Sequence, residues 1–190
     1  MGGMEGMNDS DSQSTLNPFD VLLDYERRSI AHVPGMPEQL EAPGLWRGIA
    51  FRLGDVSLLG GIADVTEILR FPALTTVPGT KAWMLGIANV RGNLIPVVDL
   101  RALLEGESER MTDRTRVLIT RVQGSMVGLV VSEVAGQRSF LEEDLLGVEA
   151  YADSPISRFL SGEVDIDGRR WGVFSMNDLC RSAEFMQAAA

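Results

Sequence analysis

The chain has 190 residues, of which 45% are apolar, and a formal net charge of −10. This is enough apolar material for one domain or two small packed ones, while the acidic balance and the single lysine, Lys81, argue against nucleic acid as a partner. No apolar run approaches the roughly 18 residues that cross a bilayer, and the acidic N-terminus lacks the order of a signal peptide. We therefore expect a cytoplasmic protein with no direct membrane insertion.

Residues 1–45 form an acidic leader with eight acidic and two basic residues. Apolar residues at helical spacing predict a short helix from Pro18 to Ala31, with Asn17 as its candidate cap. The residues at that spacing are Phe19, Leu22, Leu23 and Ile30. Prolines after the helix predict an extended linker, so we expect a partly disordered leader whose helix packs on the body or docks to a partner.

From residue 46 onward, short apolar runs alternate with turn signals, which is typical of a mainly β barrel or sandwich. In the first half we expect strands at Trp46–Leu53, Val56–Ile62, Val65–Arg70, Gly86–Val90 and Leu94–Asp99. In the second half we expect them at Thr115–Val122, Ser125–Val131, Val134–Phe140, Gly162–Ile166 and Arg169–Ser175. Short helices are expected at Lys81–Leu85, after Asp99, at Leu141–Leu146 and from Met176 to about Gln187.

The stretch from Gly86 to Leu104 is the most distinctive part of the sequence. Two apolar arms flank a turn at residues 91–93, where Gly92 and Asn93 tolerate positive φ. Pro96 cannot donate a ladder hydrogen bond, so the second arm is expected at a sheet edge or beside a bulge. Some of the apolar residues in the two arms must fill a core and others must face outward. These residues are Ile87, Val90, Leu94, Val97 and Val98.

The two halves resemble each other at a shift of 76 residues, which pairs Gly86 with Gly162 and Gly92 with Gly168. Glycines at matching turn corners are informative because the backbone requirement there is strict. We expect a domain over 46–190 that contains a duplicated five-stranded barrel. The first barrel is expected at about 46–104 and the second at about 114–182.

Residues that carry catalytic or metal-binding chemistry are sparse, so we expect no enzyme activity, no metal site and no cofactor. The one histidine, His32, lies among prolines in the leader, and too few His and Cys residues are present for a metal site built on them. The one cysteine, Cys180, is expected as a buried, inert thiol. The alternative is a small carboxylate-dependent enzyme that uses Asp99 and Glu67 near strand ends.

The run from Gly86 to Arg101 resembles the central signature of CheW-like coupling domains of bacterial chemosensory arrays. Four further segments resemble that family in its order, namely Val65–Ile68, Thr115–Ile119, Val127–Val131 and Phe159–Gly162, and the similarity covers about Trp46 to Ser182. The leader, together with Trp46–Ile49 and Pro78–Trp83, is most similar to the type IV pilus (twitching motility) branch of the family.

This resemblance implies two five-stranded SH3-like β-barrels packed together and a non-enzymatic adaptor. Its partners would be the cytoplasmic tip of a chemoreceptor (methyl-accepting) and the regulatory domain of a CheA-like histidine kinase, which has the same fold. The protein would be recruited to membrane receptor arrays through these partners. Its output would be twitching motility or, alternatively, flagellar chemotaxis.

The resemblance also implies that Glu67 and Arg91 lie close together. The pair either fixes the hairpin corner as an ion pair or brings Arg91 to a partner. An apolar groove between the barrels would take the helical receptor tip, with Val90 and Val98 or their neighbours lining it. The candidate partner-binding residues are Glu67, Asn89, Val90, Arg91, Gly92 and Val98.

Three positions depart from the family pattern. Ser132 and Ser175 each stand where an aspartate is common, and Gly60-Gly61 replaces side chains in the second strand. These departures put particular contacts in question and leave the expected fold unchanged.

Overall fold

The computed structural model describes residues 18–31, 44–122 and 124–188. The chain falls into two compact units, Met1–Leu40 and Glu41–Ala190. The first unit contains the predicted helix as α1, Pro18–Ala31, whereas Asn17 and His32 lie outside the described residues. Among the helices of the described ranges, none has the length and apolar character to span a bilayer.

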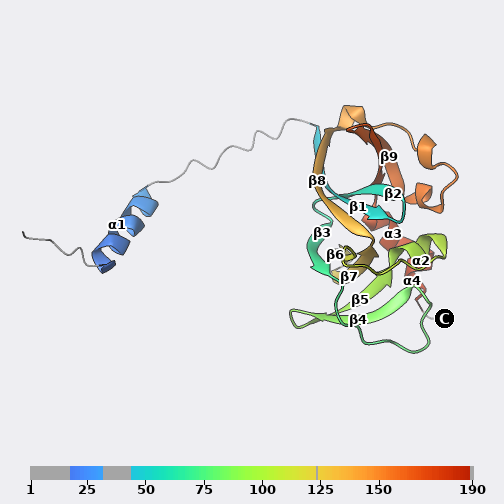
Figure 1. Ribbon diagram of the computed structural model, residues 1–190, viewed down its shortest axis with the longest axis horizontal. Coiled ribbons are helices and arrows are strands. Elements are labelled where there is room, and N and C mark those ends of the chain that lie inside the picture. The colour runs from blue at the N-terminus through green and yellow to red at the C-terminus, as the bar shows by residue number, and fades with distance from the viewer. Residues whose placement is uncertain (1–17, 32–43, 123, 189–190) are drawn as a thin grey trace, which may run out of the picture. The chain divides into compact units, whose positions relative to one another are not determined.

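The second unit is mainly β, as predicted, and its described residues contain ten strands (Figure 1). The strands are β1 Leu45–Leu53, β2 Val56–Gly61, β3 Val65–Arg70, β4 Met84–Val90, β5 Asn93–Asp99, β6 Arg116–Val122, β7 Ser125–Val131, β8 Glu133–Leu141, β9 Leu160–Ile166 and β10 Arg169–Phe174. The helices are α2 Leu100–Glu105, α3 Met176–Arg181 and α4 Ala183–Met186, with 3-10 turns η1 Glu142–Asp144, η2 Glu149–Tyr151 and η3 Pro155–Phe159. All ten expected strands are present, with ends that differ by at most two residues.

The strands form two five-stranded sheets, which appear as two curved bodies in Figure 1. The first sheet has the order β8-β1-β2-β10-β9 and the second has the order β3-β6-β7-β5-β4. Our expected division into a barrel at 46–104 and a barrel at 114–182 is therefore wrong. Each half of the chain contributes its leading hairpin, β1–β2 or β6–β7, to the sheet that holds the last three strands of the other half.

The exchange of hairpins depends on two parallel strand pairs. β2 runs parallel to β10, and β5 runs parallel to β7. All other neighbouring strands pair antiparallel. A parallel pair needs a long crossover connection, and here residues 62–168 connect β2 to β10 and residues 100–124 connect β5 to β7. The two halves of the sequence thus have the same order of strands, but each sheet contains strands from both halves.

Strand alternation buries both faces of the central strands. In β1, Ala50 belongs to a core inside the first sheet, whereas its neighbour Phe51 belongs to a large core shared by both sheets. In β5, Val97 belongs to a core inside the second sheet and Val98 to the shared core. Because successive residues point to opposite faces, such strands read as continuous apolar runs. The shared core also takes Leu100 of α2 and Cys180 of α3, as predicted for the thiol.

Pro96 is not on an edge strand, because β5 lies between β4 and β7. The other expected setting is present, because the β4–β5 register shifts between Met84 and Gly86, next to the Ile87–Pro96 pair. However, β7 pairs only with Val97–Asp99 of β5. Pro96 therefore stands in the part of β5 that has β4 as its single neighbour. The missing N–H of the proline is tolerated there for the same reason as on an edge.

Three expected helices differ from the structure. The segment Leu141–Leu146 contains only the 3-10 turn η1. Residues 81–84 form one turn, with Met84 N–H donating to the Lys81 carbonyl, and β4 begins at Met84. The last helix is interrupted at Ser182, whose hydroxyl oxygen accepts a hydrogen bond from Phe185 N–H and so begins α4. A serine side chain at this point competes with helix continuation by capping a new helix.

Candidate functional site

The β4–β5 corner is a two-residue turn formed by Arg91 and Gly92. Their φ angles are +51° and +86°, and Val90 pairs directly with Asn93. We expected a three-residue turn at 91–93 in which Gly92 and Asn93 tolerate positive φ, so the turn is one residue shorter than predicted and Arg91 has positive φ in place of Asn93. Positive φ at both central residues is typical of the type I′ turn that suits twisted hairpins.

Asn89 has a structural role in this turn. Its side-chain oxygen accepts a hydrogen bond from Gly92 N–H at 2.9 Å. The β9–β10 turn repeats this arrangement at the shift of 76 residues, because Asp165 accepts from Gly168 N–H at 2.9 Å and Asp167 has φ +55°. Asn89 and Gly92 therefore shape the corner that presents Arg91.

Arg91 and Glu67 lie close together, as the family resemblance implied. Arg91 Nη2 is 2.8 Å from Glu67 Oε1, and the side chains are 78% and 25% exposed. β3 and β4 are the two outermost strands of the second sheet, so this contact requires the sheet to be rolled until its edges meet. An exposed pair of this kind contributes only about 0–1 kcal/mol to stability. Much of the guanidinium remains free to contact another molecule.

The two valines among the candidate residues are placed differently. Val90 is half-buried against the core of the second sheet. Val98 is 2% exposed and lies in the shared core. A partner cannot reach Val98 on this surface, so our expectation that it lines a groove is not supported. From the sequence alone, alternation in β5 did not show that both faces of the strand are buried.

Exposed apolar side chains also occur on the strands that meet at the Arg91–Glu67 pair. Ile68 follows Glu67 on β3 and is 39% exposed, and Leu94, the second residue of β5, is 74% exposed. Phe71, directly after β3, is 38% exposed. Leu94 was expected in a core, and only its position two residues after the turn glycine hinted otherwise. We call Glu67, Ile68, Arg91 and Leu94 the β3–β5 corner.

Asp99, proposed above as a possible catalytic acid, is used by the fold. It is 1% exposed, and its two carboxylate oxygens accept hydrogen bonds from Ala102 N–H at 3.0 Å and Glu109 N–H at 2.8 Å. The first bond caps α2. Both oxygens are occupied and shielded from solvent. Asp99 is therefore not available as the catalytic carboxylate of the alternative hypothesis, a small carboxylate-dependent enzyme.

Other reactive groups are not brought together in the described ranges. Burial raises the pKa of the Cys180 thiol to about 12, so the sulfur stays protonated at neutral pH. Burial also raises the pKa of Asp64, which lies near this thiol. In the same part of the chain, no three His, Cys, Asp or Glu side chains are placed to share a metal ion.

The protein belongs structurally to the mainly β class, and its two five-stranded sheets exchange their leading hairpins. The CheW-like domain model matches residues 47–184. The chain therefore belongs to the CheW-like domain family, as its resemblance indicated.

Several relatives span most of this chain. Protein PilI of Pseudomonas aeruginosa is 33% identical over 172 residues, which cover 90% of this chain and 96% of that protein. The probable chemotaxis protein CheW of Rhizobium etli is 31% identical over 136 residues, covering 72% of this chain and 88% of the relative. Protein FrzA of Myxococcus xanthus is 30% identical over 127 residues, covering 67% and 79%.

A solved structure shows the same fold. The scaffolding protein TtCheW of Thermoanaerobacter tengcongensis superposes with a TM-score of 0.65 at 22% identity, over 73% of this chain and 90% of that one. The similarity to PilI extends further than this domain. Its 172 aligned residues exceed the length of the unit 41–190, so the match reaches into the first 40 residues.

Proposed function

We propose that this protein is a non-enzymatic adaptor that couples the cytoplasmic tips of chemoreceptors to a CheA-like histidine kinase. In this role it acts in the cytoplasm and reaches membrane receptor arrays through its partners. Membership of the CheW-like family carries the proposal. The similarity to PilI, which covers 90% of this chain and includes part of the leader, favours type IV pilus twitching motility as the output.

The β3–β5 corner offers the chemistry that such coupling requires. Arg91 holds a planar set of donors outside the fold and uses one of them on Glu67. Arginine is suited to bidentate contacts with carboxylates, and exposed Ile68 and Leu94 on β3 and β5 add apolar area to the same sheet. A helical receptor tip with an apolar stripe and an acidic residue would match this surface.

The test compares binding and stability in one pair of variants. Wild-type protein should co-purify with a CheA-type kinase and with a receptor-tip fragment from the same organism. Arg91→Ala should abolish capture by at least one partner while lowering the melting temperature by at most about 4 °C, since only a surface ion pair is lost. Arg158→Ala removes another exposed pair, Arg158–Glu184 at 2.7 Å, and should leave both interactions intact.

Two outcomes would contradict the proposal. Wild-type protein that binds neither partner at about 50 μM would exclude the expected affinity range for coupling. Loss of folding together with loss of binding in Arg91→Ala would assign the residue a structural role.

A flagellar chemotaxis adaptor is the second candidate, because several relatives carry chemotaxis names. Deletion of the gene separates the two outputs. Loss of surface twitching with normal swimming supports the pilus pathway, and the reverse result supports the flagellar one.

A further inference from the structure

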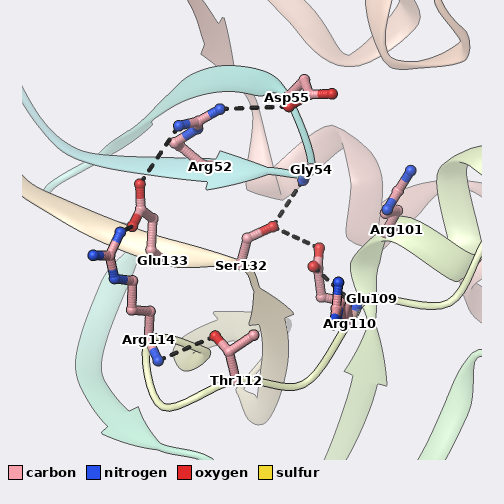
Figure 2. A pocket seen from close by; sticks show the side chains of 10 residues that line it. All are labelled: Arg52, Gly54, Asp55, Arg101, Glu109, Arg110, Thr112, Arg114, Ser132 and Glu133. Carbon is pink, nitrogen blue, oxygen red and sulfur yellow. Dashed lines mark hydrogen bonds and ion pairs between the residues drawn. The ribbon is translucent and has the colours of Figure 1, made fainter.

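Two open hollows flank the β1–β2 turn at Gly54-Asp55. One has a volume of about 360 Å³ and is shown in Figure 2, and the other has a volume of about 480 Å³. Arg52 and Asp55 line both, so the hollows are adjacent. Neither shares a residue with the β3–β5 corner.

Arginine dominates the walls of these hollows. Six arginines line them, against three carboxylates from Asp55, Glu109 and Glu133, on a chain whose net charge is −10. The arginines come from β1, α2, the α2–β6 loop and β10, and we call them the arginine band. They are Arg52, Arg101, Arg110, Arg114, Arg169 and Arg170.

Two members of the band are paired with carboxylates of the fold. Arg101 donates to Glu105 at 3.0 Å and to Glu107 at 2.7 Å, and the hydrogen bond to Glu105 raises the pKa of its guanidinium. Arg170 donates to Glu163 at 2.9 Å. These two arginines shape the walls, and their charge is already shared with carboxylates of the fold.

Two other members are exposed and have no partner. In the described part of the chain, the guanidinium groups of Arg110 and Arg169 make no hydrogen bond or ion pair. Arg110 lines the first hollow and Arg169 the second. An arginine without a partner on each side of the shared turn gives two separated sites for carboxylates.

Arg52, between the two hollows, is held only weakly. Its contacts with Asp55 and Glu133 are both 3.7 Å, which is beyond hydrogen-bond distance. Its Nε atom is buried and has no hydrogen-bond partner. Arg52 therefore adds positive charge between the two hollows without a carboxylate at hydrogen-bond distance.

The base of the band is fixed by a short network around Ser132. Ser132 Oγ accepts a hydrogen bond from Gly54 N–H at 2.7 Å and donates one to buried Glu109 Oε2 at 2.6 Å (Figure 2). This network ties the β1–β2 turn to the α2–β6 loop, from which Arg110 projects. A surface whose backbone is held in this way loses little entropy on binding.

We propose that the arginine band is a docking surface for an acidic segment of a partner protein, with Arg110 and Arg169 as the principal contacts. A protein segment fits better than a compact phosphate ligand because Asp55, Glu109 and Glu133 interrupt the positive surface. Spaced carboxylates can avoid these three groups, whereas a dense polyanion cannot. The open form of both hollows also suits an extended chain.

The experiment uses the full chain and acetyl-hexaglutamate amide as the probe, with acetyl-hexaglutamine amide as the uncharged control. At about 20 mM salt the acidic probe should bind saturably, and binding should be lost by about 300 mM, because exposed charges are screened. Amide NMR signals of Gly54, Arg110 and Arg169 should shift on titration. The control peptide should produce no shifts.

Charge reversal locates the site. Arg110→Glu combined with Arg169→Glu should weaken probe binding at least about tenfold. Arg121→Glu is the matched control, because Arg121 is exposed but lines neither hollow, and it should change binding less than about twofold. Circular dichroism should show that all variants remain folded.

Three results would overturn the proposal. They are absence of saturable binding at low salt, an equal loss of binding in Arg121→Glu, and tighter binding of inorganic pyrophosphate than of hexaglutamate at the same residues. None of these measurements involves a kinase or a receptor, so they fail or succeed independently of the proposed coupling function.

Discussion

Asp99 and Ser175 occupy equivalent places 76 residues apart, and each caps the helix that follows its strand. Asp99 Oδ1 accepts from Ala102 N–H at 3.0 Å, and Ser175 Oγ accepts from Asp178 N–H at 3.2 Å. Ser175 is one of the departures from the family pattern, and it retains the capping function. The repeat therefore conserves the hydrogen bond within this chain even where the residue type differs.

The two caps should differ in their contribution to stability. Asp99→Ala should cost about 2–4 kcal/mol because it also leaves the buried Glu109 N–H without an acceptor. Ser175→Ala should cost about 1 kcal/mol, the usual value for a lost cap. Urea unfolding of both variants measures the difference. Equal costs would show that the Glu109 hydrogen bond adds nothing.

Local structure was predictable from the sequence to a large extent. The ten strands, the glycine corners and the repeat follow from alternation and turn chemistry, which act over a few residues. The family resemblance added the approach of Arg91 to Glu67, which no local pattern contains. Cys180 could be placed in the core because a free cysteine is usually a buried residue.

The exchange of hairpins could not be predicted from these patterns. Hydrophobic alternation says that β2 and β10 are strands but does not say that they pair, because pairing joins residues more than 100 positions apart. For the same reason we expected Val98 to line a groove. Both faces of β5 are buried only after the two sheets pack together. Leu94 and the arginine band are surface features, and only the assembled fold shows what surrounds them.

Arg91 occupies a turn position that ordinarily favours asparagine or glycine. Arg91→Asn should leave the free energy of unfolding unchanged or raise it by up to about 1 kcal/mol, since relief at positive φ offsets the lost Glu67 pair. Capture of kinase or receptor should nevertheless fail. Asp167→Asn, at the equivalent turn, is the control and should preserve binding. A fall in stability of more than about 1.5 kcal/mol for Arg91→Asn would make the arginine structural.

Two glycines of the β4–β5 hairpin should respond differently to alanine. At Gly86, with φ +147°, an added Cβ would lie 2.5 Å from the backbone oxygen of Thr75, which cannot move without breaking its bridge to Ile87. Gly86→Ala should therefore cost about 3 kcal/mol or more. Gly92 has open space around it, and Gly92→Ala should cost about 1 kcal/mol for its φ of +86°. Thermal unfolding ranks them, and the reverse ranking would contradict the close approach at Thr75.

Cys180 should make the free energy of unfolding depend on pH in the alkaline range. Its pKa is raised from 9.0 to about 12 in the native state, so above about pH 9 the unfolded chain loses a proton that the folded chain keeps. The unfolded state then binds fewer protons, and the free energy of unfolding falls as pH rises, by at most about 1.4 kcal/mol per pH unit. Urea unfolding between about pH 8 and pH 10 should show a steeper fall for wild type than for Cys180→Ala. Parallel slopes would mean that the thiol ionises normally.

Ser132, which stands where the family often has an aspartate, donates a hydrogen bond to buried Glu109. Ser132→Asp would set a second carboxylate against buried Glu109, whose Oε2 lies 2.6 Å from the serine oxygen. We expect a loss of about 2–4 kcal/mol at neutral pH, because two carboxylates at this distance repel and one must take up a proton. Glu109→Gln in the same chain should recover most of that loss, since the amide can donate to the new carboxylate. Urea unfolding of the two single variants and the double variant gives the coupling energy. Additive effects would show that the two side chains do not interact. They would then contradict the hydrogen-bond network that we describe at the base of the arginine band.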